Sequence, residues 1–133
     1  MKQDGDGKYI SLEFGNTHWR QPLKYVGDLT VAAPTVVAAD ATNLAVGASG
    51  IYQLSDGTGA AAIATVSGLA SADYGRYITL LAPATNVHVP TIADNAVFVL
   101  RDGDTWTANP GSSITLQVLD DATLVETSRV QTA

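Results

Sequence analysis

Short segments in which apolar and polar residues alternate recur through the second part of the chain, from Gly50 to Val130. Ile114, Leu116 and Val118, for example, alternate with polar residues, and this period of two is typical of a strand with one buried face. Clusters rich in Asp, Gly, Asn and Pro separate the segments and favour turns. The pattern predicts strands at residues 50–55, 63–66, 77–81, 96–100, 113–118 and 123–127.

These short strands leave almost no room for helix, so we expect an all-β body built from two packed layers. The predicted fold is a jelly-roll-like β-sandwich, and a trimeric β-prism or a short β-helix is the alternative. Pro34 interrupts an apolar run between residues 26 and 50, which indicates edge strands or extended connectors there. Because Ala has a high helix propensity, a short helix within residues 32–45 stays open as an alternative.

The first 25 residues differ from the rest in their aromatic content, with four of the nine aromatic residues of the chain. They show no clear period of two or 3.6, so we predict an extended docking arm at 1–25 and an all-β body at 26–133. The aromatic side chains would either pack under the body or anchor the arm on a partner, since Trp, Tyr and Arg dominate interface energetics. The residues predicted to contact a partner are Tyr9, Phe14, Trp19, Arg20 and Tyr25.

The hydrophobic fraction of the chain is 46%, but many of these residues are Ala. An Ala side chain buries little surface compared with the roughly 1.5–3 kcal/mol gained by burying Val, Leu or Ile. A single β layer of this composition would be only marginally stable. We therefore expect self-association, which would also protect exposed sheet edges.

Charge is divided unevenly along the chain. Residues 1–25 hold four basic and three acidic residues, whereas the remainder holds three basic and ten acidic residues. Such an acidic body repels phosphates, so nucleic acid is not an expected partner. Neither an apolar stretch of membrane-spanning length nor the apolar region of a signal peptide is found, and we expect a soluble protein without a membrane partner.

Residues that carry chemistry are scarce. The chain has no Cys, and its histidines, His18 and His88, lie in no metal-binding motif. The pairs Asp102/Asp104 and Asp120/Asp121 fall in predicted turns, where Asp usually caps the backbone, and calcium binding or glycosidase chemistry are weaker readings. We predict no catalytic residues, no cofactor, no metal site and no enzymatic activity.

The order of the segments 51–55, 63–69, 74–81, 86–89 and 96–100 resembles a β module of tailed-bacteriophage virion proteins. The closing part is similar to the end of that module. It has a Pro-Gly turn at Pro110, an Ile-Thr-Leu strand at Ile114 and a strand with Glu126 before Ser-Arg.

This resemblance implies a virion structural protein, usually a homotrimer, of the kind found in tail fibres, head fibres and capsid decoration proteins. The chain lacks a long heptad or glycine-repeat shaft and starts with a short aromatic arm. Both features favour a capsid decoration protein that binds the major capsid protein on the outside of the assembled head. It would be located on the virion surface after assembly in the host cytoplasm. The alternative is a phage fibre or a receptor- or carbohydrate-binding tip protein.

Overall fold

Ten strands and two 3-10 turns make up the regular structure of residues 32–85 and 87–133, the part of the chain that a computed structural model describes. The described residues contain no α-helix, which confirms the predicted all-β class. Residues 33–133 form one compact unit, and the predicted boundary between arm and body at residues 25 and 26 lies outside the described residues. The strands are β1 (Thr35–Val37), β2 (Asn43–Ala45), β3 (Ile51–Leu54), β4 (Thr65–Ser67), β5 (Tyr77–Leu81), β6 (Thr91–Ile92), β7 (Phe98–Val99), β8 (Trp106–Thr107), β9 (Ser113–Val118) and β10 (Leu124–Val130).

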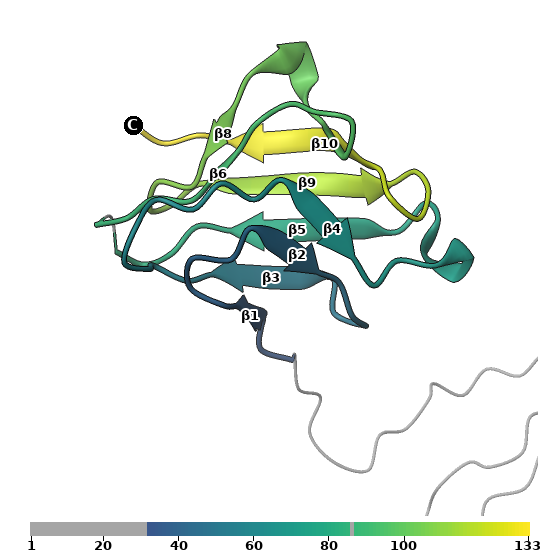
Figure 1. Ribbon diagram of the computed structural model, residues 1–133, viewed down its shortest axis with the longest axis horizontal. Coiled ribbons are helices and arrows are strands. Elements are labelled where there is room, and N and C mark those ends of the chain that lie inside the picture. Colours follow the sequence, from purple (N-terminus) through teal and green to yellow (C-terminus); the bar gives the residue numbers. More distant parts are fainter. Residues whose placement is uncertain (1–31, 86) are drawn as a thin grey trace, which may run out of the picture. The chain divides into compact units, whose positions relative to one another are not determined.

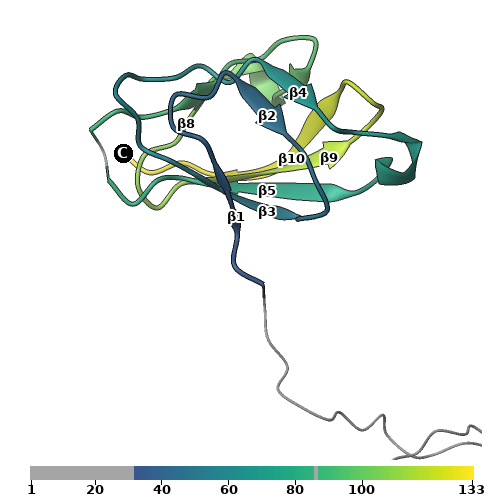
Figure 2. The same ribbon diagram turned by 60° about the horizontal axis from the view of Figure 1, so that its bottom comes forward.

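Two layers enclose the core (Figures 1 and 2). The main sheet has six strands in the order β1-β3-β5-β9-β10-β7. The second layer consists of the strand pairs β2-β4 and β6-β8. The segment before β4 links the two pairs, because the amide of Ile63 donates to the carbonyl of Thr91 in β6 at 2.9 Å. Figure 2 shows β2, β4 and β8 on one side of the main sheet.

Side-chain alternation assigns the two faces of the main sheet. Ile114, Leu116 and Val118 on β9 point inward and are essentially inaccessible to solvent. They meet bulky side chains from the second layer, including Trp106 of β8, which is fully buried. Because the large side chains are concentrated between the layers, the Ala-rich loops outside do not weaken the core.

The strand pairing departs from the predicted jelly roll. Strands β1, β3 and β5 pair in parallel, and the chain crosses to the second layer through β2 and β4 between them. A jelly roll is antiparallel, so the parallel pairing in this half differs from a jelly roll. Parallel pairing with crossings between two layers is also what a short β-helix, the alternative expected from the sequence, would contain. In the second half of the main sheet, β9 is antiparallel to both β5 and β10, as in a jelly roll. Alternation along a strand reports burial and carries no information on the direction of its neighbour, which is why the sequence did not distinguish the two.

Several strand boundaries also differ from the prediction. The strand expected at 63–66 is β4 at Thr65–Ser67, and that expected at 96–100 shortens to β7 because the Asn95 side chain accepts the amides of Val97 and Phe98. Strands β6 and β8 were not predicted, since two-residue strands leave no measurable period. The alternative helix within 32–45 is absent, and β1 and β2 lie at the edges of their sheets, as Pro34 indicated.

Candidate functional site

The five residues predicted to contact a partner all belong to the part of the chain outside the described residues. The structure therefore does not test them, and their role stays a prediction.

One face of the main sheet packs against the second layer. The opposite face points away from that layer, and we call it the outer face. Its positions follow from the strand register, in which Val36 of β1, Gln53 of β3 and Leu81 of β5 lie side by side. No described element covers this face in Figure 2. The outer face consists of Val36, Ile51, Gln53, Tyr77, Thr79, Leu81, Val99, Ser113, Thr115, Gln117, Val125, Ser128 and Val130.

Every one of these side chains is uncharged, although the chain has thirteen acidic and seven basic residues. Several are also apolar and exposed: Tyr77 is 56% exposed and Val36 is 66% exposed. Exposed sheet faces of soluble proteins usually carry Lys, Glu or Arg, and a contiguous face without charge is typical of a protein contact surface. The outer face is thus the strongest candidate for an interaction site among the described residues.

A second candidate is a groove between β1 and β2, at the open end of the parallel half. It has a volume of about 240 Å³, and the residues that line it are uncharged. Among the described strands, β1 and β2 each have a neighbour on one side only, so the other backbone edge of each pairs with no described strand. Unpaired edges accept an added strand from another polypeptide. The lining residues are Thr35, Val36, Val37, Ala38, Ala41, Asn43, Ala45 and Tyr52.

Comparison of the chain with protein-family models, with characterised proteins and with solved structures finds no match.

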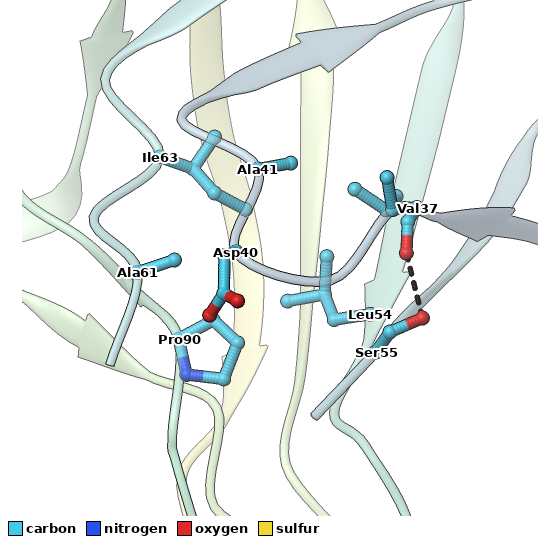
Figure 3. Close-up of a pocket in the computed structure, with 9 residues that line it drawn as sticks. Val37, Asp40, Ala41, Leu54, Ser55, Ala61, Ile63 and Pro90 are labelled. Carbon is cyan, nitrogen blue, oxygen red and sulfur yellow. Dashed lines mark hydrogen bonds between the residues drawn. The ribbon is translucent and has the colours of Figure 1, made fainter. Parts of the chain in front are cut away.

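A smaller cavity lies beside this groove and is shown in Figure 3. Its volume of about 10 Å³ admits no more than one water molecule, so it is not a substrate site. The hydroxyl of Ser55 at its rim donates to the carbonyl of Val37 at 2.7 Å. Asp40 also borders the cavity, but its carboxylate is occupied by the neighbouring loop.

Asp40 holds the loop at Thr58. Its carboxylate accepts the amide and hydroxyl of Thr58 at 3.0 and 2.9 Å and the amide of Gly59 at 3.1 Å. These bonds, that from the Thr58 amide above all, lower the pKa of Asp40. Its φ of 58° lies in the left-handed region, which Asp tolerates better than most residues. The arrangement is that of a carboxylate capping a loop.

Asp56 acts in the same way on the segment before β6. It accepts the hydroxyl of Thr85 at 2.6 Å and the amide of His88 at 2.8 Å, and the Thr85 bond is the main cause of its lowered pKa. The Nδ1 atom of His88 lies 3.8 Å from an Asp56 oxygen and forms no hydrogen bond with the described residues. A His and one carboxylate that is already occupied do not form a metal site.

The remaining acidic residues are likewise used locally or stand apart. Asp73 pairs with Arg76 at 2.6 Å, and Arg76 also donates to the carbonyl of Gly47 at 2.6 Å, which fastens the turn before β5 to the loop before β3. Among the described residues, no three His, Asp or Glu side chains gather closely enough to hold a metal ion. The described residues therefore contain no cluster of carboxylates of the kind that calcium binding at Asp102 and Asp120 would require.

The described residues contain no helix that is long and apolar enough to span a membrane.

Sequence reasoning missed the outer face, although part of its signal was present. The polar sides of the strands at 77–81 and 113–118 carry Thr, Ser and Gln and no charged residue. The full surface emerges only when the register aligns β1, β3, β5, β9 and β10, and that alignment depends on parallel pairing that the sequence pattern does not specify.

Proposed function

We propose that the chain is a capsid decoration protein of the tailed-bacteriophage type, which binds the outer surface of the assembled head and stabilises it. In this proposal the chain is a homotrimer, its partner is the major capsid protein, and residues 1–25 form an extended arm. The protein is incorporated into the virion after assembly in the host cytoplasm. Support comes from the resemblance of residues 50–130 to phage virion modules and from the surfaces described above.

The observation that carries the proposal is the outer face. A decoration protein of this type works as an assembly of copies, so it needs a broad surface through which neighbouring copies can associate. One face of the main sheet carries no charged residue, while the described acids Asp40, Asp56 and Asp73 fasten loops elsewhere. A surface of that kind suits a structural role.

Capsid stabilisation follows from mass action in this proposal. A protein that binds only the assembled lattice lowers the free energy of that lattice relative to free subunits. Three arms on one trimer raise the effective concentration of each arm at a local threefold position. The arm residues Tyr9, Phe14, Trp19, Arg20 and Tyr25 would supply the anchoring contacts, since burial of one aromatic side chain contributes on the order of 4–6 kcal/mol as an upper bound.

Binding to capsids tests the proposal directly. Heads that lack the protein are incubated with the purified full chain and imaged by cryo-electron microscopy, and we expect added density on the outer surface and a higher temperature of DNA release. The variant Trp19→Ala/Arg20→Ala should lose this density, whereas Tyr74→Ala, a change at an exposed aromatic residue of the body, should retain it. Heads without added density in the presence of folded wild-type chain would refute the proposal.

A receptor- or carbohydrate-binding tip is the second candidate, and two exposed aromatic residues favour it. Tyr74 and Tyr77 are 49% and 56% exposed, and aromatic rings are common stacking surfaces for sugars. Binding of glycans or host cells that is lost in Tyr77→Ala, with no binding to capsids, would favour this function over decoration.

A further inference from the structure

We infer that the outer face is the surface through which copies of this chain meet, so that in the assembled protein the main sheets of neighbouring copies cover one another. The inference rests on the self-association in the proposed function and assigns it to particular residues. Three independent features of the face support a second copy as its occupant.

The first feature is that four polar side chains on the face already have partners within the same chain. The hydroxyls of Thr79 and Thr115 lie 3.0 Å apart, in hydrogen-bonding contact. Gln117 donates to the carbonyl of Gly75 at 3.2 Å, and Gln53 donates to the carbonyl of Ala82. Burying a polar group is costly mainly when its hydrogen bond is lost. These groups can be covered with their bonds intact, so the face is prepared for burial.

The second feature is the shape of the surface, which has both projecting side chains and a hollow. Ile51 and Tyr77 stand out from neighbouring strands and are 43% and 56% exposed. Beside Tyr77, a hollow of about 280 Å³ lies over Gly75, Gln117 and Val125. A face that carries both projecting side chains and a hollow of side-chain size can interlock with a copy of itself, and such interlocking provides the packing density of stable interfaces.

The third feature is charge. The described part of the chain has only three basic residues, Arg76, Arg101 and Arg129, against nine acidic ones. Two copies that approach through most of this surface bring like charges together, which opposes association. The outer face is free of charge, so copies can meet there without that repulsion. The uncharged outer face therefore favours a second copy as its occupant. A basic partner would instead be attracted to the acidic parts of the surface.

Native mass spectrometry and analytical ultracentrifugation of the full chain, without capsids, test this inference. We expect a trimer for the wild type. The variants Tyr77→Glu and Ile51→Glu each place carboxylates in the contact and should weaken association at least a hundredfold, giving monomers at micromolar concentration. The matched control is Tyr74→Glu, which changes an exposed Tyr that lies outside the sheet, and it should keep the wild-type mass. Circular dichroism shows whether each variant is folded.

The outcomes separate this inference from the proposed function. A monomeric wild type, or folded Tyr77→Glu and Ile51→Glu variants that both keep the wild-type mass, would overturn the assignment of the outer face. A dimer that both variants dissociate would support the outer face and contradict the threefold arrangement. A trimer that both variants dissociate but that adds no density to capsids would support the outer face and refute decoration.

Discussion

Glu126 and Arg129 form a two-pronged ion pair on the same side of β10, with Nε and Nη2 of the guanidinium each 2.6 Å from a carboxylate oxygen. Residues three apart on a regular strand point to opposite faces. A β-bulge between Glu126 and Ser128 shifts the register by one residue and turns both side chains inward. The carboxylate also accepts the amide of Arg101 at 2.7 Å, so the bulge fastens the turn at Arg101–Gly103 to the main sheet.

Replacement of this carboxylate should destabilise the protein. Glu126→Gln keeps the shape of the side chain but removes the charge that Arg129 and the Arg101 amide face, in a position that is only 8% exposed. Hydrogen bonds to charged groups contribute about 1.5–3 kcal/mol, and we expect a loss of that size in the free energy of unfolding. Urea denaturation measures it. The control Asp121→Asn, at an exposed turn position, should change stability by less than about 0.5 kcal/mol.

Stability should fall at acidic pH. The pKa of Glu126 is lowered mainly by the bond from Arg129, and those of Asp40, Asp56, Asp73 and Asp120 are lowered mainly by hydrogen bonds from nearby backbone amides and hydroxyls. A carboxyl group with a lower pKa in the folded state stabilises the fold above its unfolded pKa of about 4 and loses that contribution as the pH drops through the folded pKa.

Denaturant titrations between pH 7 and pH 2.5 check this expectation. The free energy of unfolding should change little above pH 5 and decrease steadily below pH 4. Glu126→Gln should show a smaller decrease than the wild type, because one of the responsible groups no longer titrates. A stability that is constant down to pH 3 would contradict the prediction.

Two glycines with similar backbone angles should differ in their tolerance of a methyl group. Gly68 and Gly75 have φ values of 85° and 83°, a region that costs an L-residue about 1–2 kcal/mol. A Cβ at Gly68 would collide with the carbonyl of Val46, where β2 and β4 meet, whereas a Cβ at Gly75 would have open space. Gly75→Ala should cost only the backbone strain, and Gly68→Ala clearly more. Equal losses in thermal unfolding would argue against close contact of Gly68 with the backbone of Val46.

The hydroxyl of Tyr52 should contribute to stability through one bond. Tyr52 is 1% exposed, and its hydroxyl accepts the amide of Gly47 at 2.8 Å, joining β3 to the loop that follows β2. Tyr52→Phe leaves that amide without its acceptor, and we expect a loss of about 1 kcal/mol. Tyr74→Phe, at an exposed ring, is the matched control and should have almost no effect on chemical denaturation. An equally large loss of unfolding free energy in Tyr74→Phe would contradict a stabilising role of the bond between Tyr52 and Gly47.

The strands with a long alternating pattern could be predicted from the sequence, and those without one could not. Residues 113–118 alternate over six positions, and β9 has the predicted bounds. Strand β8 has only two residues, and its Trp106 gave no sign of belonging to a second layer. Pairing direction was out of reach because burial of a strand face is the same for parallel and antiparallel neighbours. The outer face was missed for the same reason, since Val36, Gln53 and Leu81 become adjacent only through parallel pairing.

The sequence predicted that acidic residues in turns bind backbone amides, but it did not identify all of their partners. Turn positions favour Asp because its carboxylate accepts nearby amides, and Asp120 accepts the amide of Ala122 at 2.9 Å as this rule expects. Asp40 and Asp56 reach amides 18 and 32 residues away along the chain, however, and no local pattern contains such partners.

The parallel course of β1, β3 and β5, with β2 and β4 as returning segments, has a consequence for how such a chain can vary in length. Each return through the second layer completes one coil that can stack on the next, and a further coil would pair with the edges of β1 and β2 that no described strand occupies. The β9–β10 hairpin and the bulge at Glu126 would be untouched by that growth. The architecture can therefore lengthen at one end while its closing half stays constant.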